Sequence, residues 1–450
     1  MAGGIRKKLT GVLLRFAGEH IALGNALRFA KNACLAARYR AGTLFCRTDK
    51  KMVVFCSFEG RSYSDSPRAL FEYMVCSGKF TGYTFIWAFR GDPAVYRGKL
   101  RKRLKELSVC GSMDRRPRIC VVSCNSAAWR MALGCAGYWI LNYKVKDYLK
   151  PRKDQVFVQC WHGTPLKRLG YDVTHFDNPL NTAEGLAKHY GIEVKKFSYF
   201  LSPSPFATEK FRSAWRMEDC GKSDVILEEG YPRNDILTNY TARDVQRIWK
   251  DVFGSLPRMN GRIAAPDGRK KVILYAPTYR QSQNEGTAYT YKLPFDPDIL
   301  RNALGDDFVI LFRAHYLIAN QIDFAAYKGF IYDVSSVDDV SDLYLITDIL
   351  VTDYSSSLFD FAILKRPMIF YMYDLEYYRD RSNGFYFDPQ KVLPGPIVKT
   401  QQQLIAAVRA IQEAPDAAQK ASYEHFRSTF NPHEDGQVCA RVTEAVFSGK

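Results

Sequence analysis

After residue 50, the chain alternates short apolar runs with longer stretches in which apolar residues follow helical spacing. The runs of strand length cover residues 52–58, 85–89, 119–123, 138–142, 156–161 and 199–204. These runs are apolar on both faces, and a dozen or more residues separate each from the next. The pattern predicts buried parallel strands joined by helical crossovers.

A second series of apolar runs covers residues 271–279, 308–315, 348–356 and 367–374, and the Pro-, Gly- and charge-rich stretch 255–270 before it predicts an irregular connection. Two such series predict an α/β protein with two Rossmann-like domains that face each other across a cleft. We expect an N-terminal segment at 1–50, a first domain at 51–236, a second domain at 237–415, and a C-terminal helix within 416–450 that packs back on the first domain. Ligands bind where the carboxyl ends of such strands meet, so site residues should directly follow strands.

Composition narrows the class of protein. Hydrophobic residues make up 47% of the 450 residues and charged residues 25%, which fits a globular protein with an ample core and excludes a low-complexity chain. The eleven cysteines include no CxxC pair, which argues against a disulfide framework and a zinc site and favours a reducing compartment. No run approaches the ~20 apolar residues of a membrane span, and no signal-peptide pattern opens the chain, so we expect a cytoplasmic protein.

The excess positive charge is concentrated near the N-terminus. Lys and Arg number 64 against 47 Asp and Glu, a net charge of +17. Residues 1–51 hold eleven basic and two acidic residues (11 − 2 = +9), and residues 90–118 hold ten and three (10 − 3 = +7). We therefore expect the N-terminal part to meet an anionic partner. The candidate contacts to a membrane surface or anionic acceptor are Arg6, Lys7, Lys8, Arg15, Arg101, Lys102 and Arg103.

Residues 9–37 show helical spacing of apolar residues with basic residues between them. A basic amphipathic helix of this kind can lie in an anionic headgroup layer. It can equally dock on the protein's own core, and the sequence leaves both interpretations open.

The first candidate for chemistry is the block WHGTPLK, which directly follows the run at 156–161. It places His162 at the end of a strand, beside a glycine that permits close backbone approach and a proline that can begin a helix. An imidazole in that position could take a proton from an attacking hydroxyl. A purely structural histidine is the alternative.

Two further blocks follow strands of the second series. Ser355, Ser356 and Ser357 lie between a buried strand and an apolar helix, where hydroxyls and open amides suit a phosphate, and Asp360 could accept a hydrogen bond from a ribose hydroxyl. Arg313 and His315 leave the run at 308–315 and could reach one diphosphate. Pro277, Thr278 and Arg233 give weaker signals of the same kind. P-loop, dinucleotide-binding, zinc-peptidase and esterase motifs are absent from the sequence.

These blocks resemble the CDP-glycerol:glycerophosphotransferases, the teichoic-acid primases and polymerases of bacteria. The resemblance covers roughly residues 50–440 and includes FEGRSYSDSPRALFEYM (58–74), AGYWILN (136–142), QCWHGTPLKRLGYD (159–172), GYPRNDIL (230–237), APTYR (276–280), RAH (313–315), TDYSSSLFDFAILKRPMIFY (352–371) and PGPIV (394–398). The WHGTPLK and TDYSS blocks are the specific ones. The resemblance implies a glycosyltransferase-B-like fold, with the acceptor on the first domain and the CDP-alcohol mainly on the second.

The resemblance also implies roles for individual residues. His162 would be the catalytic base, and Arg313 and His315 would act with it on the diphosphate. The implied contacts to the CDP-alcohol are Trp161, Gly163, Thr164, Pro165, Arg233, Pro277, Thr278, Arg313, His315, Ser355, Ser356 and Asp360.

The activity that the resemblance implies is transfer of glycerol phosphate or ribitol phosphate from a CDP-alcohol to a lipid-linked teichoic-acid-type or capsular acceptor, with release of CMP. No tightly bound cofactor, divalent cation or nucleic acid is called for by any visible motif, and the enzyme would lie on the inner face of the cell membrane. Two alternatives stay open: a glycosyltransferase of the same fold with a nucleotide-sugar donor, and a non-catalytic module that binds membranes or polyanions.

Overall fold

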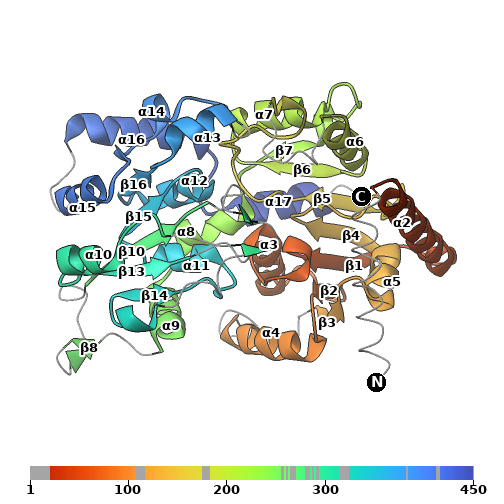
Figure 1. Cartoon of the computed structure of the whole chain (residues 1–450). Coiled ribbons are helices and arrows are strands. Elements are labelled where there is room, and N and C mark those ends of the chain that lie inside the picture. Colours follow the sequence, from red (N-terminus) through yellow and green to blue (C-terminus); the bar gives the residue numbers. More distant parts are fainter. Residues whose placement is uncertain are drawn as a thin grey trace, which may run out of the picture.

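A computed structural model of the chain describes its backbone over most of the sequence. The described residues are 21–107, 117–174, 183–254, 258–259, 262–263, 270–278, 284–285, 288–289, 293–313, 324–381, 384–411 and 416–448. They form two parallel β-sheets, each covered by helices on both faces, which lie side by side (Figure 1).

The first sheet has seven parallel strands in the order β3-β2-β1-β4-β5-β6-β7. Their bounds are β1 (Asp49–Cys56), β2 (Thr84–Phe89), β3 (Arg118–Ser123), β4 (Ala136–Leu141), β5 (Val156–Gln159), β6 (Tyr199–Ser202) and β7 (Ile226–Glu228). The central strand β1 lies between β2 and β4, where Val54 is the partner of both Ile86 and Trp139. The six predicted apolar runs all contribute strands, including the edge strand β3.

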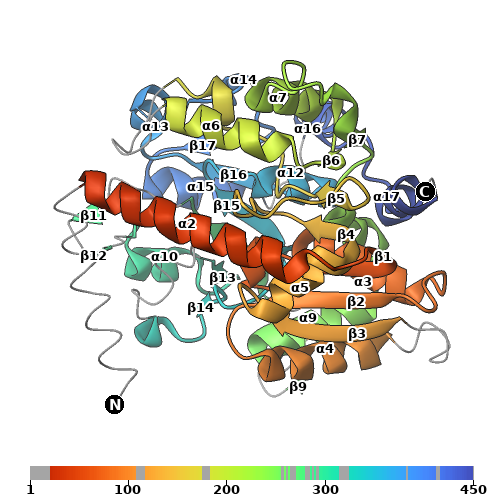
Figure 2. The same ribbon diagram turned by 90° about the vertical axis from the view of Figure 1, so that its right-hand side faces the viewer.

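Helices cover the two faces of this sheet. The helices that precede residue 220 are α2 (Ile21–Thr43), α3 (Asp65–Cys76), α4 (Pro93–Leu107), α5 (Ala127–Cys135), α6 (Ala183–Val194) and α7 (Pro205–Trp215). One core contains Tyr39 of α2, Trp129 of α5 and Phe211 of α7. The core on the opposite face contains Leu70 of α3 and Leu100 of α4. The helices α2 and α4 therefore lie on opposite faces of the first sheet, and Figure 2 shows α2 and α5 in front of it.

The second sheet has six parallel strands in the order β14-β13-β10-β15-β16-β17. Their bounds are β10 (Lys271–Ala276), β13 (Phe308–Phe312), β14 (Ile331–Asp333), β15 (Ile349–Thr352), β16 (Met368–Tyr371) and β17 (Ile397–Val398). The short pairs β8 (Arg258–Met259) with β9 (Arg262–Ile263) and β11 (Asn284–Glu285) with β12 (Ala288–Tyr289) stand outside both sheets.

The helices after residue 230 surround the second sheet, apart from the last. They are α8 (Asp235–Asn239), α9 (Ala242–Phe253), α10 (Pro297–Leu304), α11 (Val340–Leu345), α12 (Ser357–Phe361), α13 (Leu375–Arg381), α14 (Pro389–Val392), α15 (Gln401–Ala410), α16 (Ala417–Phe430) and α17 (Val438–Phe447). Single turns of 3-10 helix occupy Phe58–Gly60, Gly170–Asp172, Ser223–Val225, Pro232–Asn234, Ala325–Tyr327 and Ala362–Leu364. The prediction of two Rossmann-like domains is confirmed.

The segment 416–450, which was expected to hold one helix, holds two. Phe426 and Phe430 of α16 are buried in a core of the second sheet, whereas Val442 and Val446 of α17 are buried against α3 in the first. The chain thus returns to its first sheet at the end. The boundaries predicted for the two domains stay predictions.

The basic segments are arranged differently from the single surface that the sequence suggested. Arg6, Lys7, Lys8 and Arg15 lie outside the described residues. In α4, Arg103 is half-buried and bonded to Glu72 (2.6 Å), and Lys102 pairs with Asp251 of α9 (3.6 Å), whereas Arg101 is exposed. The contact of Arg103 with an external anion stays a prediction, and in this structure its guanidinium is already paired with a carboxylate of the protein. Along the described parts of the chain, no helix combines the length and the apolar character that crossing a membrane requires.

Candidate active site

His162 lies in the loop that follows β5, between the two sheets. Its Nδ1 is 3.2 Å from the main-chain carbonyl oxygen of Asn142, the residue after β4. A carbonyl oxygen can only accept a hydrogen bond, so Nδ1 carries the proton and Nε2 carries the free lone pair. The ring also contacts Trp161, with ring centroids 4.2 Å apart, and the edge of Phe58, at 6.0 Å. His162 is thus held in the tautomer that a general base needs.

The surroundings of His162 favour its neutral form. The protein atoms packed around the ring displace part of its water and lower the pKa of His162 below its ordinary value of 6.5. The hydrogen bond to Asn142 acts in the opposite direction, and the positive charge of Arg233 lowers the pKa further. The ring is nevertheless exposed to solvent, so water moderates the shift. Because its pKa is lowered, the imidazole is uncharged at pH 7 and able to accept a proton.

The backbone around His162 is strained. Trp161 has a φ of 51°, and Phe58, Glu59 and Asp65 in the facing segment have values of 46°, 57° and 64°. Residues other than glycine adopt this left-handed region at a cost of roughly 1–3 kcal/mol each. Such strain gathers at functional sites, where surrounding structure holds it in place.

The serine block of the second sheet meets the His162 loop directly. A Cβ atom added to Gly163 would come within 2.5 Å of Ser356 Oγ, so only a glycine permits this approach. A hydrogen bond stabilises the turn formed by the serine block, in which Ser355 Oγ accepts from the Ser357 amide (3.3 Å). The two blocks that the sequence singled out, almost 200 residues apart, therefore form one site.

Arg233 and Asp360 are buried in an ion pair. The Arg233 guanidinium donates to both carboxylate oxygens of Asp360 (3.1 and 3.0 Å) and to Asp65 (3.3 Å), and only 5% of each of Arg233 and Asp360 is exposed. Asn234 also donates to Asp360 (3.2 Å). The expected contact of Asp360 with a ribose hydroxyl, and of Arg233 with the donor, does not fit this structure. The pair instead joins the loop after β7 to α12.

The remaining predicted residues lie around the same edge of the second sheet. Arg313 follows β13, and its guanidinium donates to the carbonyl oxygens of Val334 (3.3 Å) and Val337 (2.8 Å). Burial lowers the pKa of Arg313. Pro277 and Thr278 follow β10, where the Thr278 amide donates to Asp353 (2.8 Å) beside the serine block. His315 lies outside the described residues.

Within the WHGTPLK block, burial separates the residues that a ligand could touch from those that shape the loop. Thr164 and Pro165 are buried, and the Thr164 hydroxyl has no hydrogen-bond partner among the described residues. Trp161 is half-buried and packs edge-on against Trp215 (4.7 Å). Their side chains support the loop, and His162 is the exposed side chain among them.

Sequence reasoning missed residues that orient the site. Asn142 and Phe58 position His162, and the Phe58 amide donates to the Asn142 side chain (2.8 Å). Asp65 and Arg68 bind the second sheet's helix layer, where the Asp65 amide and the Arg68 guanidinium both donate to Asp339 (3.0 and 3.1 Å). Asn142 directly follows the apolar run at 138–142, and this position after a strand is the signal that could have found it.

Comparisons with known proteins agree with this arrangement. The family model for CDP-glycerol:poly(glycerophosphate) glycerophosphotransferase matches residues 39–448. A teichoic acid glycerol-phosphate transferase of Staphylococcus aureus is 38% identical over 409 residues, which cover 89% of this chain and 93% of the relative. A teichoic acid poly(glycerol phosphate) polymerase of Staphylococcus epidermidis is 37% identical over 417 residues, or 90% of this chain, but the match spans only about half (53%) of that protein.

A solved structure is similar over nearly the whole length. The wall teichoic acid polymerase TagF, in a variant soaked with CDPG, superposes with a TM-score of 0.77 at 32% sequence identity, covering 95% of this chain and 97% of that one. The glycosyltransferase-B-like fold implied by the sequence resemblance is thereby supported, and the predicted family is confirmed. With both specific blocks brought into one site and a match over most of the chain, this protein belongs to the CDP-glycerol:poly(glycerophosphate) glycerophosphotransferase family.

Proposed function

We propose that this protein transfers glycerol phosphate from CDP-glycerol to a hydroxyl group of a lipid-linked teichoic-acid-type acceptor and releases CMP. The observation that carries the proposal is His162, a neutral imidazole whose Nε2 is free to accept a proton, directly beside the Ser356 turn of the second sheet. The names of the relatives support this substrate class, since the more similar ones act in glycerol phosphate transfer. Ribitol-phosphate relatives are also similar, at 36% and 29% identity, so CDP-ribitol is the second donor to test.

In the proposed reaction, His162 acts on the acceptor and the residues of the second sheet act on the donor. The acceptor hydroxyl gives its proton to Nε2 of His162, and its oxygen forms a bond to the phosphorus of the alditol phosphate. The bond between that phosphorus and the bridging oxygen of CMP breaks, and CMP leaves with the electron pair. The hydroxyls of Ser355 and Ser356, with Arg313 and His315, would stabilise the diphosphate and the departing CMP. In this proposal these residues, and not a divalent cation, stabilise the negative charge of the diphosphate. We therefore expect the activity to persist in EDTA.

The location of the protein is part of the proposal. A lipid-linked acceptor places the reaction at a membrane surface, and the basic N-terminal residues Arg6, Lys7, Lys8 and Arg15 would bind the inner face of the cell membrane. Sedimentation with vesicles that contain phosphatidylglycerol tests this arm separately from catalysis.

CMP release is the direct test of the function. The protein is incubated with a lipid-linked acceptor and either CDP-glycerol or CDP-ribitol, and a panel of UDP- and GDP-sugars serves as the competing donor class. We expect CMP from a CDP-alcohol and a loss of at least ~100-fold in kcat for His162→Ala, because general-base catalysis contributes 10²–10⁴-fold. Release of CMP from neither CDP-alcohol, or full activity of His162→Ala, would contradict the proposal.

A further inference from the structure

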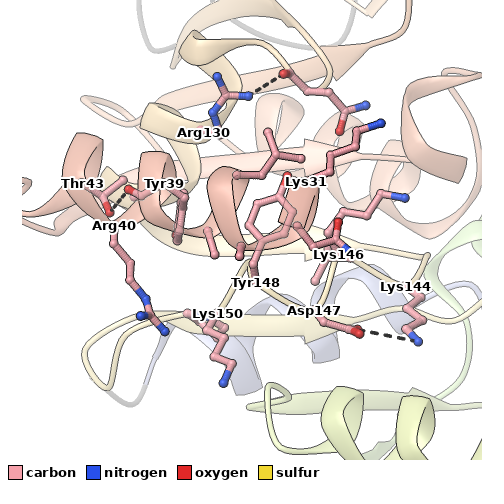
Figure 3. Close-up of a pocket in the computed structure, with 18 of the residues that line it drawn as sticks. Lys31, Tyr39, Arg40, Thr43, Arg130, Lys144, Lys146, Asp147, Tyr148 and Lys150 are labelled. Atoms are coloured by element: carbon pink, nitrogen blue, oxygen red, sulfur yellow. Dashed lines mark hydrogen bonds and ion pairs between the residues drawn. The ribbon is translucent and has the colours of Figure 1, made fainter. Parts of the chain in front are cut away.

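A large groove runs between α2 and the segment 144–152 on the first sheet. It has a volume of about 1590 Å³. Residues 29–43 of α2 form one wall, the segment that follows β4 forms the other, and Lys188 of α6 adds to the rim. At 1.5 Å per residue, the α2 wall is about 22 Å long. Figure 3 shows basic side chains from both walls around this recess, with Tyr148 between them.

The charge of the groove is strongly one-sided. Eight lysine and arginine residues line it, against two carboxylates, Glu59 and Asp147. Both carboxylates are already engaged, Glu59 with Arg61 (3.5 Å) and Asp147 with Lys144 (3.8 Å). Five exposed basic residues have no carboxylate partner among the described residues: Lys31, Arg40, Lys146, Lys150 and Lys188. We call this set the cationic groove. Unpaired like charges repel one another, so an anion that binds along the groove relieves that repulsion.

The groove lies next to the acceptor side of the active site. Its lining includes Glu59 and Lys144. Glu59 adjoins Phe58, whose ring contacts His162, and Lys144 is two residues from Asn142, whose carbonyl oxygen orients the same imidazole. The serine block meets the His162 loop at Gly163, and its residues do not line the groove. A chain that lies in the groove can therefore bring its end to His162 without crossing the donor side.

We propose that the cationic groove binds the phosphodiester backbone of the acceptor chain and holds its terminal hydroxyl near His162. This inference rests on the proposed function and names the part of the molecule that recognises the acceptor. A polymer with one phosphate on each unit matches a recess that presents separate cations along both walls. A planar headgroup layer fits less well, because the groove is concave and Lys146 and Lys150 belong to the wall opposite α2.

The test reverses two charges in the groove and compares the effect with a matched change elsewhere. The variant K146E/K150E alters two exposed side chains for which the described residues provide no ion-pair partner, so the fold should be retained. The control K328E/K420E makes the same change of net charge at exposed residues of the second sheet's layer. Both are assayed for CMP release with soluble, lipid-free glycerol phosphate oligomers of increasing length as acceptors.

We expect the groove variant to raise the KM for the oligomers about tenfold or more, which corresponds to the loss of two exposed charge contacts and their replacement by repulsion. Longer oligomers should bind the unchanged protein more tightly than short ones, and this dependence on length should disappear in the variant. The KM for CDP-glycerol and the kcat at saturating acceptor should not change. The control should behave like the unchanged protein. An acceptor KM and a length dependence that stay unchanged in K146E/K150E overturn the proposal.

A binding assay separates this inference from the proposed function. A fluorescently labelled glycerol phosphate oligomer is titrated with each protein in the absence of donor, and binding to phosphatidylglycerol vesicles is measured in parallel. Weaker oligomer binding by K146E/K150E alone supports the groove even if no CDP-alcohol yields CMP. Equal oligomer binding by all three proteins overturns the proposal. It is also overturned if K146E/K150E loses binding to the vesicles but keeps binding to the oligomer, since the groove would then be a headgroup site.

Discussion

His162 combines a fixed tautomer with an environment that disfavours its charged form. The Asn142 carbonyl holds the proton on Nδ1, and partial loss of water around the ring, with the charge of Arg233, lowers its pKa. The two effects together supply a base that is ready at neutral pH, although the side chain is exposed to solvent. Position after a strand identified this residue from the sequence, but its orienting partner is a main-chain carbonyl, for which no residue type is required.

The pH dependence of catalysis follows from the direction of this shift. Since the neutral imidazole is the active form and its pKa lies below 6.5, kcat/KM should stay constant from pH 8 down to 6.5 and fall only at lower pH. Initial rates between pH 4.5 and 8 would measure the inflection. An inflection above 6.5 would mean that the site stabilises the imidazolium, contrary to the structure.

Arg233 is a structural residue in this protein, and its loss should cost stability. Replacing Arg233 by Met leaves Asp360 and Asp65 buried without their cation, which should lower the free energy of unfolding by about 3–5 kcal/mol. The control Arg301→Met breaks an exposed pair with Asp298 and should cost less than about 1 kcal/mol. Urea unfolding of both variants measures the difference, and equal losses would contradict the buried role.

At the scale of elements, the strands of four or more residues were predictable and the strands of two or three residues were not. The runs at 52–58 and 271–279 correspond to β1 and β10, which are buried on both faces at the centre of each sheet. β7, β14 and β17 have only two or three residues each and lie at sheet edges, so their sequences carry too little periodicity to be recognised. The site residues that directly follow a strand, such as His162 after β5 and Ser355 after β15, could be predicted from the sequence. The pairing of Arg233 with Asp65, 168 residues apart, depends on tertiary contacts that no local pattern encodes.

A charge network joins α3, α4 and α11. Glu72 of α3 accepts from Arg68 (3.0 Å) and Arg103 (2.6 Å), and Arg68 continues to Asp339 and Asp342 in the layer of the second sheet (3.1 and 3.3 Å). Burial alone would raise the pKa of Glu72, but the two guanidinium groups lower it to about 2. The ionised form is therefore the one that stabilises the folded protein.

This network should make stability depend on pH in a defined window. Because the folded-state pKa of Glu72 lies below the unfolded value of about 4.5, its contribution is present above pH 4.5 and disappears as the pH falls toward 2. Glu72→Gln should lower the free energy of unfolding by up to about 3 kcal/mol at pH 7, and the difference from the unchanged protein should shrink below pH 4.5. Urea unfolding at several pH values checks this, and a difference independent of pH would refute it.

At the scale of the whole molecule, the two basic segments do not form one surface. α2 and α4 pack on opposite faces of the first sheet, and α4 directs Lys99 and Lys102 to carboxylates of the second half, Asp338 (3.3 Å) and Asp251 (3.6 Å). The net charge of +17 predicted an anionic partner, but it could not show that part of the basic excess serves contacts inside the protein. Lys31 and Arg40 of α2 have no carboxylate partner among the described residues, and they line the cationic groove.

The return of α17 to the first sheet should make the two halves interdependent. The double variant V442A/V446A removes four buried methyl groups from the contact with α3 and should lower the free energy of unfolding by roughly 3–5 kcal/mol. Glu444→Ala on the exposed side of the same helix should change it by less than about 0.5 kcal/mol. Urea unfolding followed by tryptophan fluorescence reports the result, and similar values for the two variants would show that α17 adds little to the core.

The same helix has a consequence for the order of events during protein synthesis. The part of the α3 face that α17 covers stays open until α17 leaves the ribosome, more than 200 residues after β7. At 5–20 residues per second, that interval lasts roughly 10–40 s. For this time Phe80, Tyr83 and Tyr138 of the nascent chain lack the ring contact that Phe447 of α17 gives them in the folded protein. Nascent chains of this protein should therefore be long-lived clients of ribosome-associated chaperones.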